Sequence, residues 1–432
     1  MRHSNFDALA VTPLRTDALA IVETGYTAID IGSAITQRLR IENDALHVDD
    51  AAYPIGGRRV FFIGIGKCAF VAAEAVEKLL GDQLTAGIAL DVSADVESRV
   101  QSIETYVGTH PLPSTANERA SARIVNLLSA CREDDFVLML ISGGGSTLLC
   151  LPEAPMTYLD EGKLFTDLSA KGATIQEMNT VRKHTSRARG GWLAQAAHPA
   201  QVVSLIVSDV PGNDIEFISS GPSVRDTSTV ADAREVLVRY AIPTLATLTL
   251  LETPKDAKYF EHVTNTLFLT NSHALEAMRT EAERRGYTAT IMNDHVSGEA
   301  HRVGRGIVQT LHSTAPKTVL LYAGETTVSL DESPLMPRGT GGRNQEMALA
   351  ALPEVHDDEL FLPFASDGHD NTDHAGAIAD TLTRAHGEAQ HLSVEDSLSS
   401  HNSYDFFTTT GDALVTGYTG SNVSDIIIAI KN

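Results

Sequence analysis

LMLISGGGSTLL (138–149) joins an apolar run to three consecutive glycines and a Ser-Thr step. The apolar run predicts a buried strand, and the glycines at 143–145 allow the backbone to bend and to approach a ligand closely. Ser146 and Thr147 can cap a helix whose first amides carry the positive end of its dipole. A phosphate group is the expected ligand. A tight turn that binds nothing is the alternative, and this stretch alone does not decide between them.

The same order of strand, turn and helix recurs along the chain. RRVFFIGIGKCA (58–69) ends in a second glycine turn and precedes a helical pattern. Further apolar runs that precede polar turns lie at 86–92, 202–214, 265–278, 317–327, 360–370 and 412–425. Continuous apolar strands alternating with helices predict α/β domains with largely parallel sheets covered on both faces. Ligands of such sheets bind beyond the carboxyl ends of the strands.

Two domains are expected from the length of 432 residues. Charged and proline-containing segments at 225–262 suggest a boundary, which we set between 1–235 and 236–432. The first part is expected to be a Rossmann-like domain and the second a smaller α/β domain, with the active site in the cleft between them. The last strand is allowed to return to the first domain. Residues 15–40 are expected to form one or two helices.

Composition narrows the class of protein. The hydrophobic fraction of 43% is that of an ordinary globular protein, and the net charge of −23 argues against nucleic acid or anionic membranes as partners. Three widely spaced cysteines lack disulfide or metal spacing, and the N-terminal region lacks the apolar core of a signal peptide. We therefore expect a cytoplasmic enzyme without a membrane segment.

The first glycine turn, GIGKCA (64–69), fits the G-x-G-x-x-A form of a dinucleotide fingerprint. Asp91, at the end of the next predicted strand, stands where a ribose-binding acid would. Lys67 within the turn instead suits a transferring phosphoryl group. The packing of a helix on a strand would explain both glycines without any ligand.

NTVRKHTSRARGG (179–191) is the densest basic cluster of this acidic chain. Its spacing predicts that Arg182, Arg189 and Ser186 share one face of a helix. A solvated helix face is the plain alternative. The local excess of basic residues favours an anion-binding role.

Acidic residues gather at predicted strand ends, in SDVPGND (208–214) and SDGHDNTD (366–373), with Glu325 in a third such place. They can hold Mg²⁺ or accept a proton from a hydroxyl, or they can simply form turns. GTGGRNQE (339–346) adds a glycine turn whose Arg343 could grip a carboxylate or phosphate. No HExxH pairing and no GxSxG elbow is present, so neither a zinc site nor a serine hydrolase is predicted.

Taken together, these motifs resemble the class II glycerate 2-kinase family, which joins an N-terminal glycerate-kinase domain to a C-terminal MOFRL domain. The resemblance covers almost the whole chain. Besides the stretches above, it rests on THPLPS (109–114), SDVPGNDIEFISSGPSVRD (208–226) and TGYTGSNVSD (416–425). It implies ATP-dependent phosphorylation of the 2-hydroxyl of D-glycerate to 2-phosphoglycerate, with Lys67 and Arg343 as catalytic residues.

Three departures from the family pattern surround the expected site. The usual SDGTDGPTDAAGA is SDGHDNTDHAGA here, which brings in His369, Asn371 and His374. The usual TGPTGTN is TGYTGSN, and Ser114 replaces the aspartate of the HPxPD pattern. These changes leave the identity of the hydroxy acid less firmly implied than the chemistry.

Roles are assigned on this basis, with ATP and Mg²⁺ as cofactors. Lys67, Arg343 and Asp209 are predicted to be catalytic, with Asp209 orienting or deprotonating the hydroxyl. Nucleotide or phosphate binding is assigned to Ser142, Gly143, Gly144, Gly145 and Ser146. Substrate binding is assigned to Asn179, Arg182, Glu325 and Asn344, and metal binding to Asp214, Asp367 and Asp370.

The expected partners are a small hydroxy acid and a nucleotide, and a homodimer is an assembly that the sequence leaves open. Three alternatives remain at this stage. One is an NAD(P)-dependent reductase of hydroxypyruvate or another 2-oxo acid, and another is a kinase of a related sugar acid. The third is a catalytically silent binding protein for sugar acids or sugar phosphates.

Overall fold

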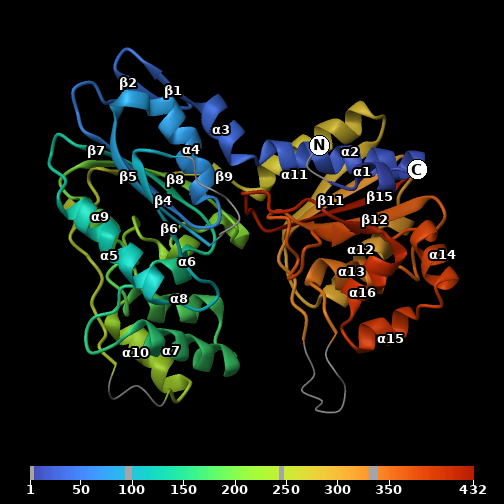
Figure 1. Ribbon diagram of the computed structural model, residues 1–432. Coiled ribbons are helices and arrows are strands. Elements are labelled where there is room, and N and C mark those ends of the chain that lie inside the picture. The colour runs from blue at the N-terminus through green and yellow to red at the C-terminus, as the bar shows by residue number, and fades with distance from the viewer. Residues whose placement is uncertain (1–3, 93–99, 243–247, 330–338) are drawn as a thin grey trace. The chain divides into compact units, whose positions relative to one another are not determined.

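The computed structural model describes residues 4–92, 100–242, 248–329 and 339–432 (Figure 1). The chain divides into two compact units. Unit 1 contains residues 1–30 and 270–432, and unit 2 contains residues 31–269. The division therefore lies at 269/270, whereas the predicted boundary at 235/236 falls inside helix α10 (Val230–Arg239). Of the predicted linker, residues 243–247 lie outside the described residues.

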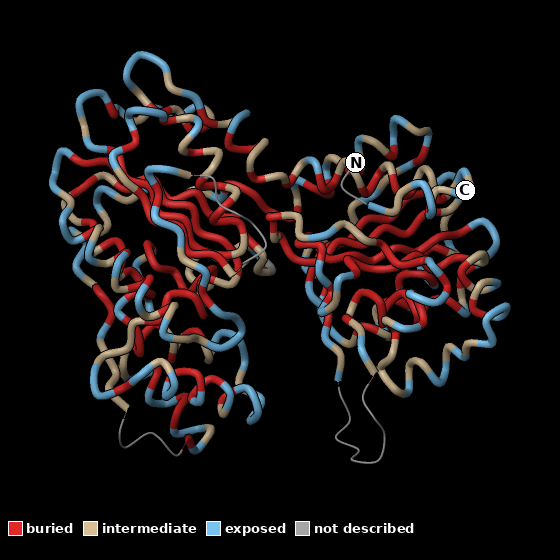
Figure 2. Tube along the Cα trace, viewed as in Figure 1, coloured by how far each residue is buried: buried red, intermediate tan, exposed pale blue. Residues whose placement is uncertain are grey.

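Unit 2 contains a six-stranded sheet in the order β6-β5-β4-β7-β8-β9, in which all neighbouring strands are parallel. Its strands are β4 (Val60–Ile65), β5 (Leu84–Asp91), β6 (Ile103–Val107), β7 (Phe136–Ile141), β8 (Gln201–Val207) and β9 (Val263–Leu269). Every residue of β4 and β7 is buried, because helices cover both faces of the sheet (Figure 2). The predicted parallel sheet of Rossmann type is confirmed.

The helices of unit 2 are α3 (Ile31–Arg38), α4 (Ala69–Leu80), α5 (Thr115–Ser129), α6 (Gly145–Leu148), α7 (Tyr158–Ala170), α8 (Ile175–Lys183), α9 (Trp192–Ala197) and α10. Most of them lie between the strands of this unit, and four of those described, α6 to α9, come between β7 and β8. Helix α4 covers one face of the sheet and α5 and α9 cover the other (Figure 1). A small antiparallel sheet that the sequence analysis missed consists of β1 (Leu39–Glu42), β2 (Ala45–Val48) and β3 (Ala51–Pro54).

Unit 1 contains a second six-stranded sheet in the order β10-β11-β15-β12-β13-β14. Its strands are β10 (Thr288–Val296), β11 (Thr318–Gly324), β12 (Glu359–Ala365), β13 (Gly376–Ala377), β14 (Ala413–Leu414) and β15 (Asp425–Lys431). Strands β10, β11, β12 and β14 point the same way, and β15 runs antiparallel between β11 and β12. The last strand thus begins at Asp425, where the predicted strand ended, and it stays in unit 1.

Helices lie on both faces of this sheet as well. They are α1 (Phe6–Leu9), α2 (Pro13–Ala28), α11 (Asn271–Arg284), α12 (Ala300–His312), α13 (Arg343–Ala351), α14 (Thr381–Ala389), α15 (Val394–Ser399) and α16 (Ser403–Thr410). Helices α2 and α11 pack together over one face, and α12, α13 and α16 lie on the other (Figure 1). Both units are therefore of the predicted α/β class.

The N-terminal helices belong to unit 1 because α2 is fixed there by buried contacts. The guanidinium of Arg15 is fully buried and lies 2.7 Å from a carboxylate oxygen of Asp380 and 2.7 Å from one of Asp412. The hydroxyl of Tyr26 donates to the carbonyl of Ala365, 3.0 Å away. A buried arginine needs such partners, and they lie more than 360 residues away in the chain. No local pattern in the sequence could indicate this pairing.

Among the described helices, none is by itself long and apolar enough to cross a membrane. Helices α2 and α3 pass the same test only when they are taken together, and the chain bends by 56° between them.

Candidate active site

The two glycine turns lie side by side in unit 2, because β4 and β7 are paired in register and Ile65 is opposite Ile141. The N–H of Lys67 donates to the carbonyl of Gly143, 3.0 Å away. Gly66 has φ +109°, and a Cβ there would lie 2.2 Å from the hydroxyl oxygen of Ser142. Only glycine fits this position, so each turn fixes the shape of the other.

Ser142 was predicted to bind phosphate, but its side chain is completely buried between the two turns. The hydroxyl donates to the carbonyl of Ile65 at 3.1 Å and accepts the N–H of Cys68 at 3.4 Å. Both hydrogen-bonding functions of the oxygen are used within the protein. The side chain therefore holds the two turns together.

The second turn leads into α6, which has only four residues and begins after Gly144, whose φ is +85°. The prediction that Ser146 and Thr147 cap this helix is wrong, since both residues lie inside it and no side chain caps it. Among the described residues, no hydrogen-bond acceptor faces the backbone N–H groups of Gly143, Gly144 and Ser146. Unpaired amides close together in a glycine turn form a concave site for an anion.

Ser219 and Ser220 support this turn, and the sequence analysis did not single them out. Their φ angles are +52° and +59°, a conformation that costs energy for residues other than glycine. The hydroxyl of Ser219 donates to the carbonyl of Ser142 at 2.6 Å. The hydroxyl oxygen of Ser220 lies 2.6 Å from Oδ1 of Asn179 and 2.9 Å from the hydroxyl of Ser146. The only sequence signal for this pair is its place in the motif 208–226.

The basic cluster at 179–191 does not form one continuous helix as predicted, because α8 ends at Lys183. Most of its charges are paired with acids: Lys183 with Asp226 at 3.1 Å, Arg187 with Glu153 at 2.5 Å, and Arg189 with Glu161 at 2.5 Å. The last pair is completely buried. These residues are structural and do not offer a charge to a ligand.

Arg182 differs from its neighbours. Within the described part of the chain, its guanidinium has no acid and no hydrogen-bond acceptor as partner, and its Nε is buried. The guanidinium carbon lies 4.5 Å from the ring centre of Phe165. Burial, with the nearby charge of Arg189, lowers the pKa of Arg182 to about 10. An unpaired, largely desolvated cation gains most from an anionic ligand.

Asn179 connects Arg182 to the glycine turn. Both residues lie on α8, three positions apart and therefore on one side of the helix. Asn179 is buried and reaches Ser146 through the hydroxyl of Ser220. Helix α8 thus carries both the unpaired cation and the asparagine that reaches the glycine turn.

The acids predicted in SDVPGND lie in the loop after β8. Asp209 is partly exposed, and its charge adds to burial in raising the pKa of the Cys68 thiol to about 12. Cys68 directly follows Lys67, so Asp209 is close to the first glycine turn. Asp214 is exposed and accepts the N–H of Glu216 at 3.0 Å. It belongs to unit 2, whereas Asp367 and Asp370, the other predicted metal ligands, belong to unit 1.

Arg343 begins helix α13 in unit 1 and is held by two acids. Its Nε and Nη2 donate to the two oxygens of Asp425 at 2.5 and 3.2 Å, and its Nη1 donates to Glu325 at 2.5 Å. Burial works to lower the pKa of Arg343, but Asp425 and Glu325 overcome this effect and raise it. Glu325, predicted to bind the substrate, and Arg343, predicted to be catalytic, therefore contact each other.

Asp370 caps the N-terminus of α13. One oxygen accepts the backbone and side-chain N–H groups of Asn344 at 3.1 and 3.2 Å, and the other accepts those of Gln345 at 2.8 and 3.2 Å. Gly342 has no room for a Cβ, which would lie 2.0 Å from the Asp370 carbonyl oxygen. Burial and the charge of Asp425 raise the pKa of Asp370 to about 6. Its lone pairs are used by the helix, which leaves little for a metal ion.

The remaining predicted residues of unit 1 lie around this cap. Asn344 is completely buried and its amide nitrogen is used by Asp370, so it positions α13. Asp367 is nearly buried, and one of its oxygens accepts the N–H of His369 at 3.1 Å. All of these groups lie where β11 and β12 end and β15 begins, because Gly324 and Ala365 are both paired with Asp425.

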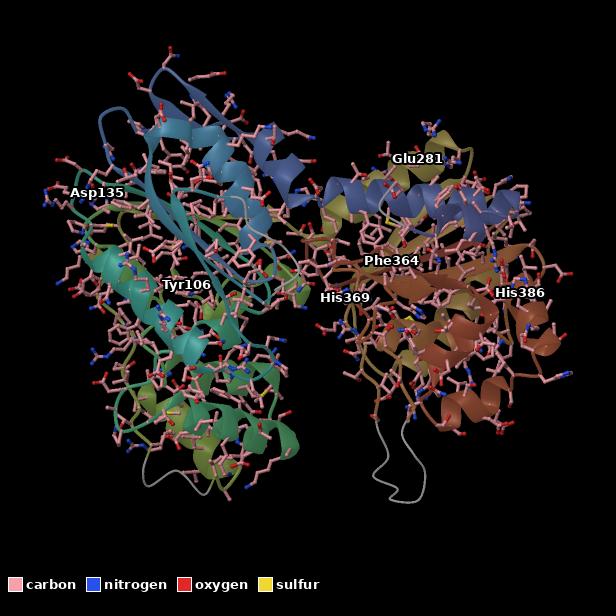
Figure 3. The ribbon with its side chains drawn as sticks, in the orientation of Figure 1. Tyr106, Asp135, Glu281, Phe364, His369 and His386 are labelled. Carbon is pink, nitrogen blue, oxygen red and sulfur yellow. The ribbon has the colours of Figure 1, made fainter. Side chains whose placement is uncertain are left out.

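The residues that depart from the family pattern have clear structural places. His369 is exposed beyond the end of β12, at the edge of unit 1 in Figure 3, and its ring centre lies 5.9 Å from that of Tyr418, another departure. His374 is buried, with Nδ1 3.2 Å from the side-chain oxygen of Gln345. Ser114 caps α5, a position that serine and aspartate fill about equally well.

The dinucleotide fingerprint is not supported by the geometry. Asp91 is buried, and its two oxygens accept the N–H groups of Phe70 at 3.0 Å and Val92 at 2.6 Å. It caps α4 and is not available to a ribose. The glycine turn itself is filled by Ser142 and Gly143, where a pyrophosphate would need to approach.

Comparisons with known proteins agree with this architecture. A domain described as a domain of unknown function (DUF4147) matches residues 17–251, and the MOFRL family matches residues 318–425. A "Glycerate 2-kinase" from Pyrococcus horikoshii is 36% identical, covering 96% of this chain and 97% of its own. A protein from Agrobacterium vitis with the provisional name hydroxypyruvate reductase is 38% identical, covering 85% of this chain and 86% of its own. The crystal structure of a glycerate kinase from Thermotoga maritima has a TM-score of 0.83 at 31% identity and covers 96% of this chain and 99% of that one.

Proposed function

This chain belongs to the class II glycerate 2-kinase family, and we propose that it transfers the γ-phosphoryl group of ATP to the 2-hydroxyl of D-glycerate, giving 2-phosphoglycerate and ADP. The observation that carries the proposal is the unpaired Arg182, joined through Asn179 and Ser220 to the open amides of the second glycine turn. The two features match the two charged ends of the reaction, a carboxylate and a phosphate.

Lys67 and Arg182 then have separate roles in unit 2. The backbone amides of Gly143, Gly144 and Ser146 hold phosphate oxygens, and the ammonium of Lys67 neutralises the charge that grows on the transferred group. The guanidinium of Arg182 binds the carboxylate of the hydroxy acid. Ser142, the fifth residue predicted for phosphate binding, builds the turn instead, and Gly145 provides the space that Ser219 fills.

The chemical step is an in-line displacement. The 2-hydroxyl oxygen forms a bond to the γ-phosphorus while the bond between that phosphorus and the β–γ bridging oxygen breaks. The hydroxyl proton passes to a base, for which Asp209 is the candidate in unit 2. Mg²⁺ would supply charge neutralisation for the nucleotide phosphates, and in unit 2 the exposed carboxylate of Asp214 would be its candidate ligand. In unit 1 Asp370 is used as a helix cap, which leaves Asp367 as the acid there with capacity for a ligand.

Arg343 is proposed to stabilise charge on the phosphoryl group. Asp425 sets the orientation of the Arg343 guanidinium. Glu325 holds one edge of the same guanidinium and must release it if that edge is to contact a ligand. The three free cysteines fit a reducing compartment, and we propose the cytoplasm as the location.

The test is an assay of the purified chain with ATP, MgCl₂ and D-glycerate in which ADP formation is followed and the product is identified by ³¹P NMR. We expect a phosphate ester on O2 of glycerate, and a K67M variant should lose about 100-fold in kcat. Transfer to O3, or ADP formation that does not depend on D-glycerate, would contradict the proposal. A panel of other hydroxy acids and sugar acids shows whether a related acid is the better substrate.

The reductase remains a second candidate because a close relative is provisionally named for that activity. The use of Asp91 as a helix cap opposes it. Oxidation of NADH by hydroxypyruvate without ATP would favour the reductase, and it is expected to be absent.

A further inference from the structure

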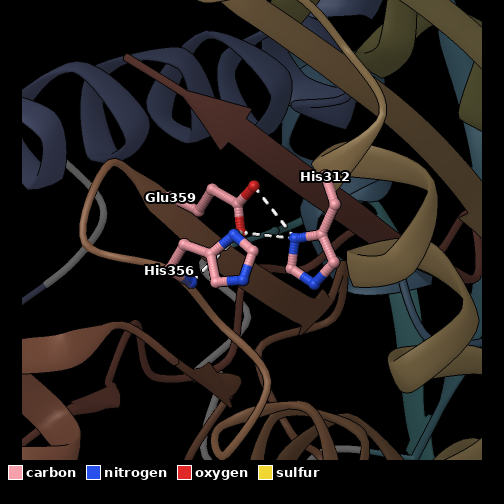
Figure 4. Close-up of side chains that lie close together, drawn as sticks. All are labelled: His312, His356 and Glu359. Atoms are coloured by element: carbon pink, nitrogen blue, oxygen red, sulfur yellow. Dashed lines mark hydrogen bonds and ion pairs between the residues drawn. The ribbon is translucent and has the colours of Figure 1, made fainter.

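Three metal-binding side chains come together in unit 1, away from the residues described above (Figure 4). His312 is the last residue of α12, His356 lies in the loop before β12, and Glu359 is the first residue of β12. One ligand atom from each residue lies within 4.8 Å of the others. The three positions belong to three different elements, so no spacing motif marks them in the sequence.

The donor atoms are arranged around one carboxylate. Nδ1 of His312 lies 2.9 Å from Oε2 of Glu359, and Nδ1 of His356 lies 3.6 Å from the same oxygen. The two imidazole rings are stacked, with centres 3.9 Å apart and planes at 19°. In a tetrahedral zinc site with bonds of about 2.0–2.2 Å, neighbouring donors lie roughly 3.3 Å apart. The observed separations lie on either side of that value.

The surroundings suit a metal ion. The carboxylate of Glu359 is completely buried, while His356 is 59% exposed and His312 is 25% exposed, so water can reach the donors as a fourth ligand. Burial works to raise the pKa of Glu359, but its contacts with His312 and His356 overcome this effect and lower it.

An ion-pair cluster without metal is the competing explanation, because the ammonium of Lys431 lies 3.4 Å from Oε1 of Glu359. That ammonium also donates to the carbonyl of His312 at 3.1 Å. Lys431 by itself balances the charge of Glu359, so charge balance does not require the imidazoles. The lysine contacts Oε1 and Nδ1 of His356 faces Oε2, whereas Nδ1 of His312 lies 2.9 Å from Oε2 and 3.1 Å from Oε1 (Figure 4).

We propose that His312, His356 and Glu359 form a site for a divalent transition-metal ion of the Zn²⁺ type. The ion would connect the end of α12 to the start of β12 and so stabilise unit 1. The site is separate from Arg343: Glu359 is at one end of β12 and Ala365, paired with Asp425, is at the other. Six residues of strand separate them by about 20 Å.

The experiment is a calorimetric titration of the metal-free, full-length chain with ZnCl₂. We expect one site per chain, and an H356A variant, which removes an exposed side chain, should bind at least tenfold more weakly. H295A is the matched control, because His295 also contacts a carboxylate, that of Asp294 at 2.7 Å, but has no second histidine beside it. This control should bind as the wild type does.

A K431M variant separates the metal site from the ion-pair cluster. Removing the competing ammonium should strengthen Zn²⁺ binding severalfold, while H312A should weaken it as H356A does. Zn²⁺ should also raise the melting temperature of the wild type and of H295A but not that of H356A. The proposal is overturned if the wild type shows no saturable site, if H356A binds as tightly as the wild type, or if K431M binds more weakly.

Discussion

Arg182 in unit 2 and Arg343 in unit 1 are both predicted site residues, but their surroundings differ. Arg343 is gripped by Asp425 and Glu325, and its pKa is raised. Arg182 rests on the ring of Phe165 with no acid of the described residues in direct contact, and burial lowers its pKa although the charge of Glu161 acts against this. An arginine that already has partners holds structure together, whereas one without partners is ready for an anion. We therefore expect the loss of Arg343 to reduce stability as well as activity, and the loss of Arg182 to reduce ligand binding without a loss of stability.

The largest effect is expected from R343M, which leaves the buried carboxylate of Asp425 without its partner. Unfolding free energy should fall by about 2–4 kcal/mol, as when one member of a largely buried ion pair is removed. Urea unfolding measures this loss. The double variant R343M/D425N should recover most of the stability but not the kinase activity. If the double variant also regains activity, Arg343 has only a structural role.

R182M, in contrast to R343M, should lose activity without losing stability. We expect kcat/KM for the hydroxy acid to fall about 100-fold, since a charge-assisted contact to the carboxylate is lost. Stability should be unchanged or higher, because the variant no longer buries an unpaired charge. R187M is the matched control, since Arg187 is exposed and paired with Glu153, and its kinetics should be normal. A normal kcat/KM for R182M would remove the carboxylate role.

The pH dependence of unit 1 should reflect Asp370. Its pKa is raised from the ordinary value of 3.8 to about 6, so the folded protein holds a proton that the unfolded chain has released between these values. This contribution to stability is present below pH 4 and is lost as pH rises through about 6. We expect a decrease on the order of 1–3 kcal/mol in unfolding free energy between pH 4 and 7. D370N should be less stable than the wild type over this whole pH range, and its unfolding free energy should lack this decrease. If the unfolding free energy of D370N falls with pH as steeply as that of the wild type, a group other than Asp370 causes the decrease.

The smallest effect is expected from Ser220, which connects the Arg182 helix to the glycine turn. S220A removes the hydroxyl between Asn179 and Ser146 and should reduce kcat/KM by about fivefold to tenfold, equivalent to roughly 1 kcal/mol. S220G should lose the same activity yet be more stable than S220A, because glycine adopts φ near +59° without strain. The melting temperatures of S220A and S220G, measured by thermal unfolding, compare the stability of the two variants. Equal activity in S220A and the wild type would contradict the proposed role of Ser220 in connecting α8 to the glycine turn.

Much of the fold could be predicted from short-range patterns. The buried runs at β4, β7, β8, β11 and β12, each followed by a polar or glycine turn, were recognised from their sequences. The small sheet β1–β3 and strands β6, β10 and β13 were missed. In β10 exposed and half-buried positions are mixed and only the last residue, Val296, is buried, so no apolar run marks the strand. The boundary was placed from composition, which carries no information on where α2 packs.

The candidate site was predicted less completely than the fold. Residue types and motifs pointed to Lys67, Arg182, Arg343 and the glycine turns; the turns with Lys67 follow strands β4 and β7, as expected, whereas Arg182 lies in helix α8. The roles of individual residues depend on partners elsewhere in the chain. Ser142 is enclosed by the neighbouring glycine turn, and the carboxylate of Asp370 accepts N–H groups at the start of α13. The contribution of Ser219 and Ser220 follows from their backbone conformation. Positive φ angles at two serines before a Gly-Pro step cannot be predicted from the sequence.

The sequence by itself determined that this is an α/β protein of the glycerate 2-kinase family with glycine turns at its strand ends, because strand burial and turn chemistry act over a few neighbouring residues. Only the tertiary structure decided which of five clustered basic residues is left for a ligand. Arg189 finds Glu161 28 residues away, and Arg343 finds Asp425 82 residues away, while nothing in the described chain pairs with Arg182. Electrostatic pairing depends on distance in space, and distance in space is set only once the whole chain has folded.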